Sequence, residues 1–223
     1  AESSAPASTR IISPLLELLQ KPDTSKKQKA FIFNVIRQGM REEIINTTSF
    51  TTAKGGGLKG GKRGNVDQLL QVVRPLERSV DTLRDAHSYE EVFLDLAVAF
   101  SSASVLKNIC DVSGAQGHAM LVQNDVIPKL MRVLSEIKDF LPRFSSVKHF
   151  HYDTPPFCMD AQTHTIKSQK YRLLIYIFNV RLFREICGAI SNCCQCLSNL
   201  QSDLMEFTNC VPLIQLLAYE EGD

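Results

Sequence analysis

The residues Ile12-Ser13-Pro14-Leu15-Leu16-Glu17-Leu18-Leu19 are the stretch that decides the fold. Their apolar side chains recur at spacings of three and four, which places them on one broad stripe of a helix. One polar residue separates the two apolar pairs, and the whole arrangement returns later in the chain. The later copies are 66–73, 127–134 and 210–217, with Gln71, Arg132 and Gln215 at the position of Glu17. The sequence therefore predicts four copies of one short amphipathic helix.

A second element places an asparagine among apolar residues, and it occurs after each of the first three helices. The asparagines are Asn34, Asn108 and Asn192. A small residue precedes each by one helical turn, so the two side chains share a face of the helix. These small residues are Ala30, Ser104 and Gly188. An aliphatic pair then follows on a third short segment, as Ile44-Ile45, Leu121-Val122 and Leu204-Met205.

The three elements keep one cyclic order, although the spacing between successive copies is irregular. Segments of variable length account for the irregularity, and we assign insertions to about 47–64, 74–93 and 136–165. Without them the repeat length is about 40 residues, as in helical repeats of the HEAT and armadillo type. One such unit cannot bury its own apolar stripe, so neighbouring units must stack.

At these residues the chain resembles the armadillo repeat family. The stretch 12–23 resembles the family's first helix and the turn after it, and Gly64-Asn65-Val66 and Val126-Ile127-Pro128 resemble the turn that precedes that helix. The resemblance implies an all-α fold, an armadillo-type right-handed superhelical solenoid of about three and a half repeats. Residues 1–10 would form an N-terminal tail and 11–223 a single solenoid. A HEAT-like solenoid is the alternative.

The resemblance also implies a binding surface. In armadillo proteins the long third helices line a concave groove, where asparagine amides hydrogen-bond the backbone of an extended peptide. That role would fall to Asn34, Asn108 and Asn192; alternatively, these amides satisfy the backbone of neighbouring repeats. Family members that bind basic localisation peptides carry Trp one turn before the asparagine, and this chain contains no Trp. The sequence therefore argues against an importin-like role.

A basic, glycine-rich segment lies in the first insertion, at 54–64. Its four cationic residues are Lys54, Lys59, Lys62 and Arg63. The glycine and lysine spacing approaches a P-loop, but Arg63 replaces the Ser or Thr that would bind magnesium and no buried strand precedes it. We therefore exclude nucleotide binding. The segment is either a solvated insertion or an electrostatic contact for phosphates or an acidic tail.

Residues that can bind metals occur in the third insertion and near the end of the chain. His149, His151, Asp153, Cys158, Asp160 and His164 fit no standard zinc spacing, so a structural loop is expected and no metal or cofactor is predicted. The seven cysteines favour reduced thiols in an intracellular compartment. Four of them fall in an expected long helix over about 166–198, where Cys193 and Cys194 align with core positions of the repeat.

Composition limits the class of partner. The net charge of +1 provides no overall attraction to nucleic acid or anionic lipid. The longest apolar run, 173–180, is too short for a bilayer, so no membrane span is predicted. We expect a non-enzymatic scaffold that binds other proteins through the concave third-helix groove and the repeat insertions, in a cytoplasmic multi-subunit assembly, with cytoskeletal or ciliary assemblies as one setting. The alternative is binding of nucleic acid or acidic tails through 54–64.

Overall fold

The computed structural model describes residues 7–45, 63–83, 86, 88–112, 121, 124–140 and 163–196. Within these ranges the regular elements are all helices, so the predicted all-α class is confirmed. The helices are α1 (Ala7–Gln20), α2 (Lys26–Arg41), α3 (Arg63–Asp81), α4 (Tyr89–Val112), α6 (Val126–Phe140) and α7 (Thr163–Cys196). The expected long helix over about 166–198 is confirmed as α7.

The helices extend into the assigned insertions. Helix α3 begins at Arg63, inside 47–64, and runs through Pro75 to Asp81, inside 74–93. Helix α4 begins at Tyr89, also inside 74–93. Segment 136–165 contributes the last turn of α6 and the first residues of α7. These residues lengthen the repeat helices, while the fourth copy of the first helix, 210–217, lies outside the described residues.

Helix α2 has a well-defined start and end. At its N-terminus Ser25 and Gln28 form a capping box, in which the Gln28 amide donates to Ser25 Oγ and the Ser25 amide to Gln28 Oε1. After the last turn, Glu43 adopts a positive φ of 59° and the amides of Ile44 and Ile45 both donate to the Gly39 carbonyl. This turn folds Ile45 back over Gly39, where it is buried, and leaves Ile44 exposed.

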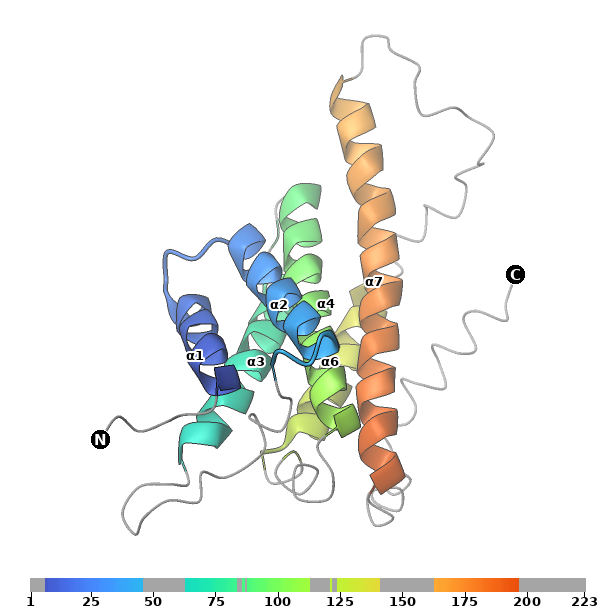
Figure 1. Cartoon of the computed structure of the whole chain (residues 1–223). Helices are drawn as coiled ribbons and strands as arrows, with labels where there is room; N and C mark the ends of the chain where they lie inside the picture. The colour runs from blue at the N-terminus through green and yellow to red at the C-terminus, as the bar shows by residue number, and fades with distance from the viewer. Residues whose placement is uncertain are drawn as a thin grey trace.

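The helices pack in two rows. Helices α1, α3 and α6 contact one another in that order, and α2, α4 and α7 do the same. Each member of the first row also contacts the member of the second row that follows it in the chain. Figure 1 shows α1 and α2 at one side of the molecule, α7 at the other and α4 between them. The copies of the first helix therefore form one row and the asparagine helices the other.

Helices α2, α4 and α7 run parallel. Along α4, Phe93 contacts Tyr171 of α7 and Phe100 contacts Phe178, so both helices advance together. The contacting positions recur every seven residues on each helix, which is typical of parallel helices packed at a small crossing angle. On the other side, Lys27 pairs with Glu90 near the start of α2, and Arg37 reaches Phe100 later.

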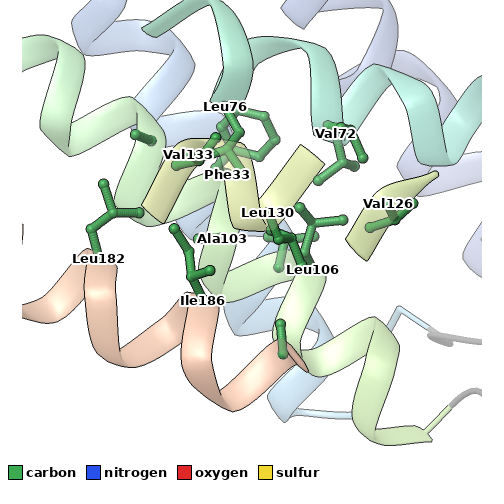
Figure 2. Close-up of a cluster of buried hydrophobic side chains, with 14 of the residues drawn as sticks. Phe33, Val72, Leu76, Ala103, Leu106, Val126, Leu130, Val133, Leu182 and Ile186 are labelled. Atoms are coloured by element: carbon green, nitrogen blue, oxygen red, sulfur yellow. The ribbon is translucent and has the colours of Figure 1, made fainter. Parts of the chain in front are cut away.

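The core lies between the two rows. The apolar stripe predicted for the first helices supplies Leu16, Leu69 and Leu130, which are buried, while Glu17 and Arg132 are exposed. In Figure 2, Leu130 and Val133 of α6 lie between side chains of α3 and α7. The labelled core residues are Phe33, Val72, Leu76, Ala103, Leu106, Val126, Leu130, Val133, Leu182 and Ile186. The helices with the repeated apolar stripe thus form the first row, and the helices that carry the asparagines form the second row.

Helix α4 contains a segment, Tyr89–Asp111, that is long and apolar enough to cross a bilayer by length and composition. A buried core helix meets the same criterion, so the prediction of no membrane span stays a prediction. The physical reason for the apolarity of α4 lies in the packing, since 67% of that window is buried and α4 contacts α2, α3 and α7. A core helix surrounded by others needs apolar residues on every side.

Candidate functional site

The seam between α4 and α7 is the most extensive helix contact in the described part of the chain, and aromatic rings fill its first half. The Phe178 ring lies edge-on to both Phe93 and Phe100, with centroids 5.2 and 5.4 Å apart. Tyr171 lies against Phe93 at 5.8 Å. Such edge-to-face contacts add stability beyond the apolar area that they bury, so this seam fixes the register of the two helices.

Polar contacts continue the seam around Lys107. Its ammonium group pairs with Glu185 Oε2 at 3.4 Å, and its backbone carbonyl accepts a hydrogen bond from Asn192 Nδ2 at 3.4 Å. The methylene groups of Lys107 cross α7 at Gly188, where an added Cβ would lie 2.9 Å from Lys107 Cε. A small residue at 188 therefore allows the lysine to lie along α7.

The three predicted groove asparagines occupy different environments. Asn34 is exposed on α2, Asn108 is half-buried on α4, and Asn192 is half-buried on α7 with its amide bonded to the backbone of α4. The side chain of Asn192 thus bridges α7 and α4, two neighbouring helices of the second row.

Arg37 of α2, which the sequence did not indicate as a site residue, lies over α4. The Arg37 guanidinium carbon is 5.9 Å from the centroid of the Phe100 ring, a cation–π distance. Its Nε is buried, as is the Ser104 hydroxyl, and neither has a hydrogen-bond partner among the described residues. Ser104 was identified only as the small residue before Asn108. The sequence carries no signal that Arg37 reaches this part of α4, one turn before Ser104, because residues 37 and 104 lie on different helices.

The ion pairs of α2 and α4 include one buried carboxylate. Asp95 is 2% exposed and accepts from Lys26 Nζ at 2.8 Å, while the Lys27–Glu90 pair at 3.6 Å is much more exposed. Ser102, also on α4, donates to the Val72 carbonyl of α3 at 2.6 Å. These contacts connect α4 to α2 through the two ion pairs and to α3 through Ser102.

Two buried cysteines meet at the end of the seam. Cys110 of α4 and Cys193 of α7 are free, buried thiols, which confirms the core position predicted for Cys193. A hydrogen bond to the Cys193 thiol, together with burial, raises the pKa of Cys110 well above its usual range. Burial raises the pKa of Cys187 to about 11. Cys110 and Cys187 are therefore protonated at neutral pH and poor nucleophiles, whereas the hydrogen bond with Cys110 lowers the pKa of Cys193.

Several predicted site residues lie outside the described part of the chain. Lys54, Lys59 and Lys62 of the basic segment do so, and Arg63 is described only as the first residue of α3. The histidine-containing segment of the third insertion also lies outside, except that His164 belongs to α7. Within the described ranges, no group of three or more His, Cys, Asp or Glu side chains could hold a metal ion.

Comparison with known proteins gives no match: no protein-family model fits the chain, and neither the curated proteins nor the solved structures include a significantly similar one. The armadillo resemblance therefore depends on the repeated residues alone.

Proposed function

We propose that the chain is an armadillo-type, right-handed helical solenoid of about three and a half repeats that serves as a non-enzymatic scaffold for other proteins. The main support is the packing of its helices in two rows, with the helices of the second row parallel and staggered side by side. In stacked helical repeats, such a row provides an extended surface that suits a protein partner.

The composition of the α2, α4 and α7 row supports this proposal. Exposed and half-buried polar side chains, including Asn34 and Asn108, lie beside aromatic and aliphatic groups. Exposed large apolar residues occur at both ends of the row, as Phe31 on α2 and as Leu173 and Tyr176 on α7. Amides beside apolar side chains are suited to binding a polypeptide, whose backbone needs hydrogen bonds and whose side chains need contact area.

We further propose that the scaffold acts as a subunit of a larger cytoplasmic assembly. The charge balance supports a protein partner over nucleic acid, because a net charge of +1 offers no general attraction to phosphate backbones. A cytoskeletal or ciliary assembly is one setting for such a subunit.

Site-specific photo-crosslinking tests the proposal. A photoreactive residue at Asn34 of α2 samples the second row, and one at Arg74 of α3 samples the first row; both positions are exposed, so neither change disturbs the core. In cells we expect a discrete crosslinked protein from position 34 and little from position 74. Equal crosslinking at both positions, or none at either, would contradict the proposed binding row.

A further inference from the structure

Beside Phe93, Phe100 and Lys107, α4 carries a stripe of small or short polar residues. Ala97, Ser101, Ser104 and Asn108 are spaced by four, three and four positions, so they form one stripe along the helix. Ser102 bonds to α3, and Ser104 follows it by two positions, about 200° around the helix. The stripe therefore faces away from α3, and we call it the floor between α2 and α7, the two other helices that contact α4; its first three residues are buried.

The Arg37 side chain covers part of this floor, but its Nε forms no hydrogen bond with the described residues. Its guanidinium lies over Phe100, and Ser104 follows Phe100 by one helical turn. Arg37 Nε and Ser104 Oγ are both buried donors without a hydrogen-bond partner among the described residues, and Ser104 is only 2% exposed. Leaving such groups unpaired costs free energy, and a bound acceptor would recover it.

Further positive charge lies on the opposite side of the floor. Arg181 follows Phe178 by three positions on α7, and Phe178 packs on Phe100, so Arg181 lies one helical turn beyond the residue of α7 that contacts this ring. Arg181 and Arg184 are exposed, and among the described residues neither forms an ion pair. The nearby carboxylate of Glu185 is already paired with Lys107.

We propose that this floor of α4 binds a carboxylate side chain of an acidic segment in the protein partner, with Arg37 and Ser104 as its main donors and Arg181 as a supporting charge. The inference deepens the proposed function and depends on it. A carboxylate carries only acceptors and takes two parallel donors from a guanidinium, which matches the unpaired donors found here. Among the described residues the contact of Arg37 with the Phe100 ring is its one side-chain interaction, so the guanidinium is free to take a carboxylate.

Fluorescence anisotropy with a short, labelled Glu-rich peptide tests the inference, with the same peptide carrying Gln for Glu as the probe control. Arg37→Gln is expected to weaken binding of the Glu peptide about tenfold, the usual effect of losing one charge-assisted hydrogen bond. The matched control Arg74→Gln removes an exposed arginine of α3 and should leave the affinity unchanged.

Ser104→Ala separates ligand binding from structural support. Because the hydroxyl is buried and unpaired, its removal should keep or raise the thermal midpoint while weakening the Glu peptide severalfold. Equal binding of the Glu and Gln peptides, or unchanged affinity in both variants, overturns the inference. Tighter binding of a single-stranded oligonucleotide that is equally sensitive to Arg37→Gln also overturns it, in favour of phosphate. If the peptide fails to bind while crosslinking from Asn34 persists, only this inference fails and the scaffold function stands.

Discussion

Replacement of Gly39 by Ala tests the packing at the end of α2. An added Cβ would lie 2.7 Å from Ile45 Cδ1 and 3.0 Å from its Cγ1, closer than real Cβ atoms approach other atoms. Ile45 is only 2% exposed, and its amide donates to the carbonyl of the same glycine. The isoleucine therefore has no free space to move into, and relief of the clash must displace a buried side chain.

The magnitude follows from two opposing effects. Displacing Ile45 forfeits part of the roughly 1.5–3 kcal/mol gained by burying an aliphatic side chain. Alanine returns at most about 1 kcal/mol through its greater helix propensity, and less near a helix end. We expect a net loss of about 1–2 kcal/mol in the free energy of unfolding, measured from urea denaturation followed by circular dichroism.

Gly188→Ala is the matched control, since its Cβ would also approach a neighbour at 2.9 Å, but that neighbour is the flexible end of Lys107. The lysine can move at the expense of a partly exposed ion pair with Glu185, which contributes about 0–1 kcal/mol. Gly188→Ala should therefore be neutral or slightly stabilising. The double variant Gly39→Ala with Ile45→Val should lose less than the two single losses added together. A Gly39→Ala protein as stable as the parent would refute the reasoning.

Three other changes have expected outcomes. Lys26→Met leaves the buried Asp95 carboxylate without its ion-pair partner and should lower the free energy of unfolding by about 1–3 kcal/mol in chemical denaturation. Lys27→Met breaks an exposed pair and should lower it by under about 0.5 kcal/mol, so equal losses would contradict the burial argument. Asn179→Leu removes a buried amide with no partner for its nitrogen or oxygen and should stabilise by about 1 kcal/mol, so a lower thermal midpoint would reveal a missed interaction. Burial raises the pKa of Cys187 from 9.0 to about 11, so its alkylation by iodoacetamide in the native protein should be slow at pH 8 and accelerate toward pH 11. An alkylation rate that levels off near pH 9 would contradict this expectation. Because the folded state holds this proton more tightly, the associated stability is complete below pH 9 and is lost as pH rises toward 11.

The helical class and much of the core follow from local periodicity. The stripe in 12–19 predicts the buried side of α1, and the copies at 66–73 and 127–134 predict those of α3 and α6. An apolar face repeats at the helical period whatever the helix packs against, so such residues can be identified within one segment. Helical periodicity did not indicate a single apolar side for α4, because this helix is buried on every side and acidic residues interrupt its apolar run.

The surface proposed for binding depends on relations that no single segment contains. Arg37 reaches Phe100, and Asn192 reaches the carbonyl of Lys107, across contacts between helices that are far apart in the chain. Alignment of the repeats treats the three asparagines as equivalent, but Asn34 is exposed, whereas the Asn192 amide bonds to the backbone of α4.

The sequence by itself thus determined the helical class and the apolar side of α1, α3 and α6, because hydrophobic periodicity is a local property. Only the tertiary structure decided which helices run parallel, where Arg37 lies and which buried donors remain unpaired. The stagger between helices is set by how bulky groups such as Phe93, Phe100 and Phe178 interlock, and that depends on the packing of the whole molecule.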